Sequence, residues 1–171
     1  MTCALCGRAV AAFETYGIPP RAGRCPHCGS KWRHRALALL ARETLLARLP
    51  AGAEILEVGP TSGILLELAA LWGAGGGRYT AVDVRELRLG VRLPAPHRFM
   101  VMDARALAFP DASFDLVLCG NMLSFVDEDR AALAEFKRVL KPGGLALLSV
   151  HREKGPTLSA GEWSRRHPRM A

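Results

Sequence analysis

The stretch that decides the fold is "ILEVGPTSG", residues Ile55 to Gly63, a hydrophobic segment that runs into a loop framed by two glycines. An apolar, helix-like run begins directly after it, at Ile64. A strand, a glycine loop and a helix in this order are typical of a ligand-binding turn in α/β proteins. The glycines let the backbone approach a ligand, and the start of the helix offers unpaired N–H groups.

Apolar runs and amphipathic stretches alternate on both sides of this loop. Apolar runs predict strands at 54–58, 79–83, 98–102, 115–119 and 145–150. Helical periodicity predicts helices at 62–72 and 127–140, and a short helix is expected near Glu86. Such alternation favours an α/β fold with a doubly wound, mainly parallel, Rossmann-like sheet of about five strands.

Two helix boundaries can also be predicted. An amphipathic helix precedes the first strand, with its apolar face at Leu37, Leu40, Leu45 and Leu49, and it is expected to end at Pro50. The segment 142–144, Pro-Gly-Gly, is expected to end the last helix and to turn the chain into the final strand.

Four of the five cysteines form two matching CxxCG units. Cys3 and Cys6 make the first unit, Cys25 and Cys28 make the second, and 18 residues separate the two. Two residues between thiolates let both sulfurs face one ion, and the following glycine lets the backbone curl. The spacing predicts a structural zinc site, with iron as the competing ion and disulfides as an alternative that a reducing cytosol disfavours.

Four thiolates complete the coordination of zinc, so the ion is expected to stabilise a small zinc-ribbon-like module and to take no part in catalysis. His27 lies inside the second unit and is expected to be a bystander, and Cys119 is expected to be a core residue. The predicted organisation is a zinc module at 1–33, a ligand-binding domain at 34–150 and a short basic tail at 151–171.

The net charge of +7 comes from the two ends of the chain: +6 in residues 1–50, −2 in 51–150 and +3 in 151–171. Basic ends can attract RNA, DNA or an acidic protein, and scattered solvated arginines explain the same excess. The sequence has no apolar run long enough to span a bilayer and no signal-peptide pattern, so we expect a cytoplasmic protein without membrane association.

Two kinds of nucleotide ligand suit the glycine loop. A dinucleotide prefers GxGxxG, but Thr61 and Ile64 stand at the second and third glycine positions. S-adenosylmethionine has no phosphates and carries cationic groups, for which Glu57 ahead of the glycines is useful. Asp83 ends the second predicted strand, 20 residues past Gly63, where a carboxylate can accept hydrogen bonds from both ribose hydroxyls. These residues favour S-adenosylmethionine.

"EVGPTSG" resembles the first motif of class I S-adenosylmethionine-dependent methyltransferases, usually written ExGxGxG. The segment 101–150, with "DARALAFPDASFD" and "RVLKPGG", resembles the block from their third strand through their fifth. The resemblance covers about 100 of the 171 residues. "CPHCGSKWRHR" is similar to a zinc-bearing N-terminal extension of some members of this superfamily.

The resemblance implies a cofactor site. Glu57 and the backbone of 59–63 would face the methionine part, Asp83 the ribose, Asp103 and Ala104 the adenine, and Asn121 the methyl group or the methionine end. The implied cofactor-binding residues are Glu57, Gly59, Pro60, Thr61, Gly63, Asp83, Val84, Asp103, Ala104 and Asn121. Structural explanations exist beside these roles: a tight turn for the glycines, a cap for Asp83 and a solvated strand end for Asp103.

Three features depart from the family pattern. Thr61 replaces the central glycine of the first motif, and Ser124 and Phe125 stand where many relatives carry Glu-His. Only 21 residues follow the fifth predicted strand, where relatives continue with a further helix and two strands. The strand at 145–150 would then be an exposed edge, which we expect a second subunit or a partner chain to cover.

The expected function is methyl transfer from S-adenosylmethionine to an unidentified small molecule, RNA or protein. Alternatives are a non-catalytic cofactor-binding subunit that acts in assembly, and a nucleic-acid-binding zinc module. Methyl transfer needs mainly alignment of donor and acceptor and exclusion of water, so a general base is optional. No catalytic residue is assigned; His151 is a candidate base and His97 a weaker one.

Overall fold

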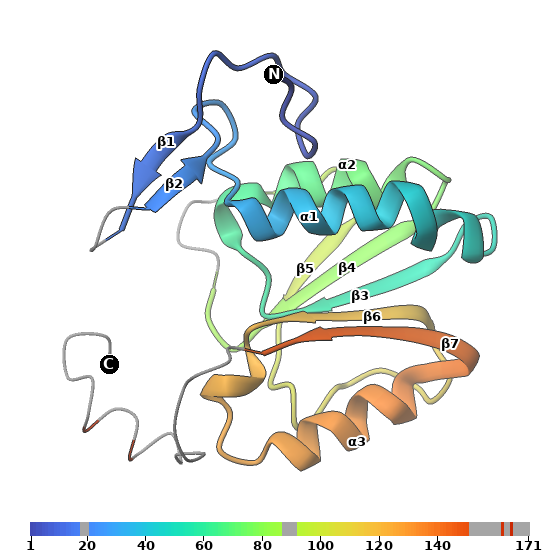
Figure 1. Ribbon diagram of the computed structural model, residues 1–171. Coiled ribbons are helices and arrows are strands. Elements are labelled where there is room, and N and C mark those ends of the chain that lie inside the picture. The colour runs from blue at the N-terminus through green and yellow to red at the C-terminus, as the bar shows by residue number, and fades with distance from the viewer. Residues whose placement is uncertain (18–20, 87–91, 151–161, 163–164, 166–171) are drawn as a thin grey trace. The chain divides into compact units, whose positions relative to one another are not determined.

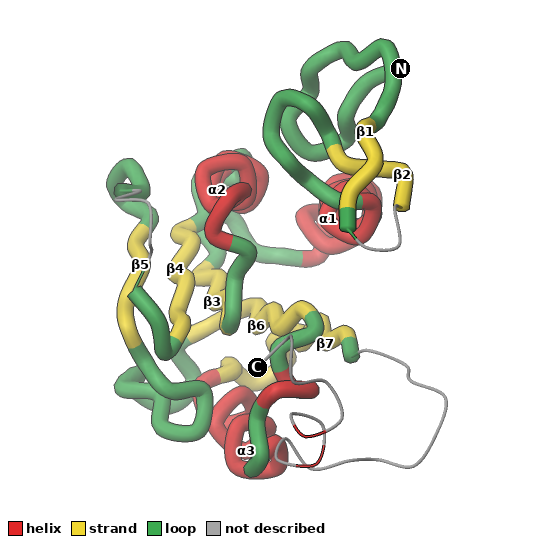
Figure 2. Tube along the Cα trace, turned by 90° about the vertical axis from the view of Figure 1, so that its left-hand side faces the viewer, coloured by secondary structure: helices red, strands yellow, loops and turns green. Residues whose placement is uncertain are grey.

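The computed structural model describes residues 1–17, 21–86, 92–150, 162 and 165 (Figure 1). Five strands form one sheet in the order β5-β4-β3-β6-β7, and two short strands form a separate hairpin (Figure 2). The strands are β1 (Glu14–Tyr16), β2 (Arg21–Arg24), β3 (Glu54–Val58), β4 (Arg78–Asp83), β5 (Arg98–Val101), β6 (Phe114–Gly120) and β7 (Leu140–Ser149). Because the strand order runs outward from β3 in both directions, the predicted doubly wound, Rossmann-like sheet is confirmed.

In the described part of the chain, three α-helices accompany these strands. They are α1 (Trp32–Leu40), α2 (Leu65–Gly73) and α3 (Asp129–Val139). A π-helical turn (Ala41–Leu45) and a 3-10 turn (Leu46–Arg48) continue α1 toward Pro50, and a 3-10 turn (Ser62–Ile64) leads into α2. The predicted strand at 54–58 coincides with β3, and the other strand predictions overlap β4 to β7. The described residues 84–86 form no helix near Glu86, and 87–91 lie outside the described residues.

The predicted role of the Pro-Gly-Gly segment is wrong. Helix α3 already ends at Val139, and residues 142–144 lie inside β7. The pairing of β6 with β7 is parallel and shifts register: Phe114 faces Leu140, whereas Leu116 faces Leu145. The extra residues of β7 form an irregularity, which an edge strand tolerates, and Gly143 adopts φ +78° there.

The predicted apolar face of the first helix needs a correction. The side chains that are buried along α1 and its continuation are those of His34, Ala38, Ala41 and Leu45, whereas Leu40 is 40% exposed. Of the four leucines expected on the buried face, only Leu45 is buried. The buried face therefore carries two alanines, one leucine and a histidine in place of the row of leucines that the sequence suggested.

The described chain divides into two compact units that do not follow sequence order. The first unit contains Met1–Ile55, Thr61–Thr80 and Leu87–Phe99, and the second contains Leu56–Pro60, Ala81–Glu86 and the chain from Met100 onward. The boundaries expected from the sequence, 33/34 and 150/151, remain a prediction.

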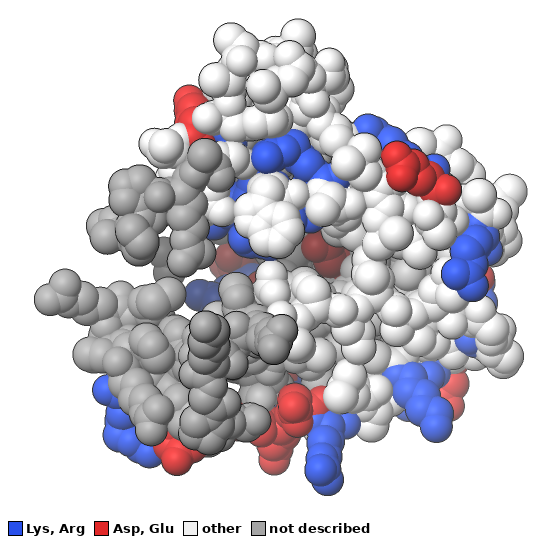
Figure 3. All heavy atoms as spheres, viewed as in Figure 1, with Lys and Arg blue, Asp and Glu red and all other residues white. Residues whose placement is uncertain are grey.

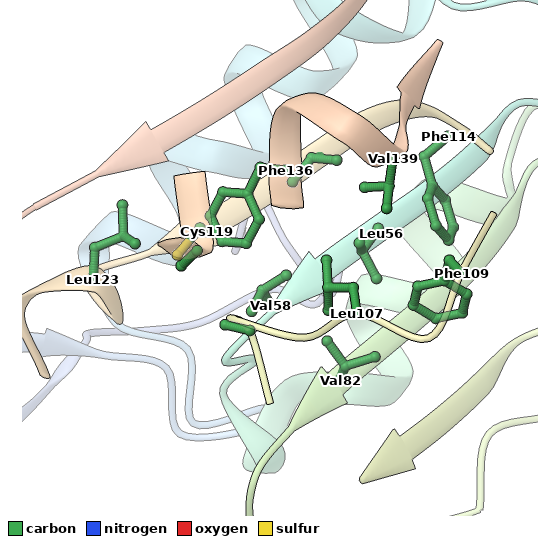
Figure 4. Packing of buried hydrophobic residues seen from close by; sticks show 13 residues of the cluster. Leu56, Val58, Val82, Leu107, Phe109, Phe114, Cys119, Leu123, Phe136 and Val139 are labelled. Atoms are coloured by element: carbon green, nitrogen blue, oxygen red, sulfur yellow. The ribbon is translucent and has the colours of Figure 1, made fainter. Parts of the chain in front are cut away.

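The second unit has one hydrophobic core (Figure 4). Leu56 and Val58 of β3 meet Phe136 and Val139 of α3 in this core, together with residues from β4, β6 and the segment 104–109. Phe109 and Phe114 pack edge to face, with ring centroids 5.0 Å apart. Cys119 is 1% exposed and belongs to the same cluster, as the sequence predicted.

The first unit is held by large buried side chains and by one close backbone approach. Trp72 of α2 and Tyr79 of β4 are almost fully buried. A Cβ atom at Gly77 would lie 2.8 Å from the Trp72 carbonyl oxygen and 3.1 Å from that of Ala53, so only glycine fits there. The turn between α2 and β4 therefore depends on glycine at this position.

On the face drawn in Figure 3, Lys and Arg alternate with Asp and Glu and form no single basic field. Among the helices of the described residues, none is long and apolar enough to span a bilayer.

Candidate cofactor site and metal centre

The two CxxCG units form two matching turns. Gly7 N–H donates to the Cys3 carbonyl and Gly29 N–H to the Cys25 carbonyl, both at 2.9 Å. Both glycines adopt positive φ, +72° and +71°. Glycine adopts this left-handed conformation without strain. Gly7 and Gly29 therefore let the backbone curl behind each cysteine pair, as the sequence suggested.

The four cysteine sulfurs converge on one point. The Sγ atoms of Cys3, Cys6, Cys25 and Cys28 all lie within 4.8 Å of one another. Cys3 Sγ lies 3.9 Å from Cys28 Sγ, and Cys6 Sγ lies 4.0 Å from Cys25 Sγ. Tetrahedral zinc with Zn–S bonds of about 2.3 Å separates its sulfurs by about 3.8 Å, so the donor set fits the ion.

Ser30 supports this sulfur cluster from within. Its side chain is fully buried, and the hydroxyl oxygen lies 3.1 Å from Cys28 Sγ and 3.5 Å from Cys3 Sγ. Burial raises the pKa of the Cys3 thiol, but hydrogen bonds from the Cys6 backbone, the Ser30 hydroxyl and the Leu5 backbone outweigh this and lower the pKa to about 6. These donors stabilise a thiolate, which is the form that binds metal.

A surface hollow of about 500 Å³ lies beside the cluster in the first unit and contains none of the predicted cofactor residues. Cys6, Arg42 and Leu66 are among its lining residues. The Arg42 guanidinium donates to the carbonyl oxygens of Ala4 and Leu5, the latter at 3.3 Å. Arg42 therefore fastens the first cysteine turn to the helical segment.

Gly59 follows β3 and can only be glycine. Its φ is +69°, and a Cβ atom there would lie 2.5 Å from Met122 Cγ and 2.7 Å from Met122 Cβ. Its N–H donates to the Val82 carbonyl of β4 at 2.9 Å. The end of β3 thus lies against both β4 and the segment that follows β6.

The predicted acid after β4 is partly engaged. Asp83 Oδ1 accepts a hydrogen bond from the Arg85 N–H at 3.0 Å, and the carbonyl of Asp83 accepts one from the Met102 N–H at 2.9 Å. Among the described residues, Asp83 Oδ2 has no hydrogen-bond partner, and the side chain is 26% exposed. Val84, the next residue, is 61% exposed.

The predicted acid after β5 is more strongly engaged. Asp103 accepts hydrogen bonds from the Arg105 N–H at 2.9 Å and from its guanidinium, the shortest at 2.7 Å. Arg105 also contacts Glu128 Oε2 at 3.0 Å. The side-chain and backbone hydrogen bonds from Arg105 lower the pKa of Asp103. Ala104, beside it, is 5% exposed.

Glu57 of β3 is 7% exposed, which is unusual for an acid. It lies near Cys119 of β6: burial, with a smaller contribution from the negative charge of Glu57, raises the pKa of Cys119 to about 11. Cys119 is therefore a neutral thiol at physiological pH. Of these two neighbours, Glu57 is the one that carries the charge.

Asn121 follows β6 in the left-handed conformation, φ +60°, and its N–H donates to the Ser149 carbonyl of β7 at 2.8 Å. The second unit thus brings together most of the predicted residues at the ends of neighbouring strands. These are Glu57, Gly59, Pro60, Asp83, Val84, Asp103, Ala104 and Asn121.

Thr61 and Gly63 belong to the first unit. Thr61 Oγ1 lies 3.3 Å from Nε2 of the buried His34. Gly63 is under no packing constraint, because a Cβ atom there would meet nothing within 4 Å. The contact with His34 thus gives a structural reason for threonine in place of glycine at 61. Packing gives no reason for the glycine at 63.

Sequence reasoning missed three residues that shape the site: His34, Arg105 and Met122. No sequence motif marks these three residues, because each contacts a site residue that is at least two positions away or in another segment of the chain. Of the candidate bases, His97 Nδ1 accepts a hydrogen bond from the Tyr79 N–H at 3.2 Å. Burial lowers the pKa of His97, and His151 lies outside the described residues.

The fold defines an α/β domain of the Rossmann-like type, and comparison with known proteins identifies the class. A family described as "Methyltransferase domain" matches residues 56–148, which is more than half of the chain. The chain therefore belongs to the methyltransferase-domain family, and the resemblance to class I S-adenosylmethionine-dependent methyltransferases is confirmed.

The names of individual relatives differ in the methyl acceptor. The chain is 37% identical over 123 residues to a ubiquinone biosynthesis O-methyltransferase of Xanthomonas axonopodis, covering 67% of this chain and 50% of that protein. It is 34% identical over 137 residues to a demethylmenaquinone methyltransferase of Roseiflexus castenholzii (77% and 54%). A phosphatidylethanolamine N-methyltransferase of Cereibacter sphaeroides is 33% identical over 111 residues (61% and 55%). The chain spans about half the length of these relatives.

Solved structures share the fold. The YcgJ protein from Bacillus subtilis superimposes with a TM-score of 0.51 at 26% identity, covering 65% of this chain and 48% of that one. The [4+2]-cyclase SpnF superimposes with a TM-score of 0.57 at 23% identity (84% and 52%). SpnF is named for a reaction other than methyl transfer, so the fold by itself does not fix the chemistry.

Proposed function

We propose that this chain binds S-adenosylmethionine at the carboxyl ends of its strands and transfers the methyl group to an acceptor. The observation that carries the proposal is the placement of acids at the ends of three neighbouring strands, Glu57, Asp83 and Asp103, beside a glycine that allows no side chain. A carboxylate at the end of the second strand suits a ribose. Glu57, a further acid ahead of the glycine, suits a ligand that carries positive charge.

Each acid has a proposed role. Asp83, with Oδ2 uncommitted among the described residues, accepts hydrogen bonds from the ribose hydroxyls. Glu57 compensates the positive charge of the methionine part. Asp103 and the backbone of Ala104 face the adenine, and Arg105 shares the Asp103 carboxylate, so we assign more of the affinity to Asp83 than to Asp103.

The remaining predicted residues shape the loop around the ligand. Gly59, Pro60, Thr61 and Gly63 supply backbone next to the methionine part, Val84 lies beside the ribose, and Asn121 faces the methyl end. A bound S-adenosylmethionine supplies an activated methyl group on a sulfonium. The residues of this chain bind and orient that donor and exclude water, which is most of what an in-line displacement requires.

Methyl transfer is what the names of these relatives have in common. Their names include O-methyltransferases and an N-methyltransferase, with quinone-pathway and phospholipid acceptors. We therefore propose methyl transfer as the function and S-adenosylmethionine as the donor. The alternative of a non-catalytic assembly subunit is supported by no observation here.

We also propose that the four cysteines bind a structural zinc ion. Their sulfurs fit its geometry, and two short strands with few buried residues offer little other stabilisation. With four thiolates the coordination is complete, so the ion holds the module together and leaves no position for a substrate.

Asp83→Asn tests the cofactor site. The amide keeps an acceptor for the Arg85 N–H but loses the charge that binds the ribose, and a hydrogen bond to a charged group contributes about 1.5–3 kcal/mol. We expect S-adenosylhomocysteine to bind about 10- to 100-fold more weakly in calorimetry.

Asp129→Asn is the matched control, since Asp129 is an exposed acid at the start of α3. It should bind S-adenosylhomocysteine as the unmodified chain does. A chain that gives no heat with S-adenosylmethionine or S-adenosylhomocysteine, but binds a dinucleotide, would refute the proposed function.

A further inference from the structure

His34 occupies an unusual place in the first unit. It lies on the first turn of α1 and is only 7% exposed, although it is a polar residue flanked by Arg33 and Arg35. Both ring nitrogens have a partner. The Lys31 N–H donates to Nδ1 at 3.1 Å, and Nε2 lies 3.3 Å from Thr61 Oγ1.

These two contacts determine the tautomer. Because Nδ1 accepts the backbone N–H of Lys31, Nδ1 carries no proton, and the ring proton of the neutral imidazole is on Nε2. Nε2–H therefore donates to the hydroxyl of Thr61. One side chain thus caps the start of α1 and at the same time holds a residue of the loop that follows β3.

On its other side, the start of α1 is joined to the sulfur cluster. Ser30, the residue before the cap, has its hydroxyl 3.1 Å from Cys28 Sγ. Its carbonyl oxygen accepts the Cys25 N–H at 2.9 Å and Arg35 Nη1 at 2.8 Å. Hydrogen bonds and the Ser30–Lys31 peptide bond therefore link Cys28 through Ser30, Lys31 and His34 to Thr61, and every member belongs to the same compact unit.

Thr61 is also the residue at which the loop departs from the family motif. A glycine there would have no hydroxyl for His34 to bind, and the loop would be free at this point. The turn ahead of α2 begins at the same residue, since the backbone carbonyl of Thr61 accepts the Ile64 N–H at 3.0 Å. Threonine in place of the motif glycine at 61 therefore gives the buried His34 its hydrogen-bond partner.

We propose that His34 is a positioning residue that couples the state of the four-cysteine cluster to the conformation of the loop at Thr61. When metal orders the cluster, the cap at Lys31 and the His34–Thr61 hydrogen bond hold the loop in one conformation. The consequence for the cofactor rests on the proposed function: an ordered loop binds S-adenosylmethionine without first losing conformational entropy.

Two substitutions of His34 separate its two contacts. Asn places an acceptor where Nδ1 lies and cannot reach Thr61, whereas Gln places a donor where Nε2 lies and loses the cap. We expect His34→Asn to bind S-adenosylhomocysteine about three- to tenfold more weakly, as the loss of one neutral hydrogen bond implies. We expect His34→Gln to keep most of the affinity and to melt at a lower temperature.

Thr61→Val closes a double-mutant cycle. It removes the hydroxyl at nearly constant volume, so it should weaken S-adenosylhomocysteine binding as much as His34→Asn does, and the double variant should be no weaker than either. Additive losses, or a His34→Asn variant with unchanged affinity, would show that His34 only packs.

Amide hydrogen exchange tests the coupling without any cofactor. In the full chain, removal of metal with a chelator should speed exchange at 61–65, and this response should disappear in His34→Asn and Thr61→Val. If exchange at 61–65 ignores the metal, the coupling is overturned. If the response is present but S-adenosylhomocysteine does not bind, the proposed function fails and the coupling of cluster to loop stands.

Discussion

Gly59 and Gly63 frame the same loop, but packing constrains only Gly59. At Gly59 a side chain would combine a left-handed backbone with a collision with Met122. We expect Gly59→Ala to lower the free energy of unfolding by about 2–4 kcal/mol, the sum of backbone strain and overpacking, in urea denaturation.

Gly63→Ala is the natural comparison. A methyl group at this position meets nothing, so stability should change by less than about 1 kcal/mol. S-adenosylhomocysteine should nevertheless bind more weakly, because the added carbon takes the space that we assign to the ligand. Unchanged affinity in this variant would remove Gly63 from the proposed site.

The titration of His34 gives a second prediction about a single residue. Burial, followed by the positive charges of Arg33, Lys31 and Arg35, lowers the pKa of His34 to about 4. The unfolded chain therefore binds a proton below about pH 6.5 that the folded chain does not bind until about pH 4. The stability linked to neutral His34 is present above pH 6.5 and is lost as the pH falls toward 4.

We expect the free energy of unfolding to fall by about 1–2 kcal/mol from pH 7 to pH 5 through this residue. Parallel denaturation of His34→Asn isolates the contribution, since Asn does not titrate. Equal slopes in both proteins would mean that His34 takes up its proton as readily in the folded state as in the unfolded chain, which contradicts the lowered pKa.

The two cysteine turns are the element for which metal matters most. Cys6→Ser removes one ligand at a half-buried position, whereas Cys119→Ala removes a thiol from the core of the second unit, which is not part of the four-cysteine cluster. We expect about one zinc ion per chain by elemental analysis in the parent and in Cys119→Ala, and much less in Cys6→Ser. Exchange protection in 1–35 should fall with the metal content.

If Cys6→Ser retains its metal and Cys119→Ala loses it, the zinc site is contradicted. Iron in place of zinc would appear in the same elemental analysis and would colour the protein. The sulfur geometry would then still hold, since four thiolates also bind iron.

Strand β7 is an element whose structure the local sequence does not decide. The residues Lys141 to Gly144 look like a helix stop and turn, but pairing with β6 on both sides of the irregularity draws them into the strand. Long-range pairing thus overrides a local turn signal, as is common at the edge of a sheet.

At the scale of the molecule, β7 ends the sheet, as the sequence led us to expect of the strand at 145–150. None of its ten residues is buried, and Leu148 is 38% exposed. A hollow of about 430 Å³ between α3 and β7 is lined by Leu140 and Leu148 of β7 and by Leu133 of α3, which extends this apolar surface. We propose that a second subunit or a partner chain covers this edge.

Light scattering of the purified chain, combined with amide exchange along 145–150, tests this edge. A dimer with slow exchange at this strand would identify a second copy as the cover. A monomer whose 145–150 amides exchange rapidly would contradict the proposal. Leu148→Lys should convert such a dimer to monomer without unfolding the second unit.

The sequence by itself determined what depends on neighbours along the chain. The run 54–58 reads as a strand because its residues are apolar and bounded by turn signals, and the two CxxCG units curl because each glycine lies directly behind its cysteine. The class of protein followed as well, since the glycine loop and the 101–150 block are continuous segments.

Only the tertiary structure decided what depends on residues far apart in the chain. Met122 makes Gly59 obligatory, Arg105 occupies the Asp103 carboxylate, and His34 holds Thr61 across 27 positions. Local patterns carry turn and periodicity preferences, but burial and hydrogen-bond partners exist only once distant segments have packed. For that reason the predicted site rests on local motifs, whereas the contacts that hold its loop could be read only from the structure.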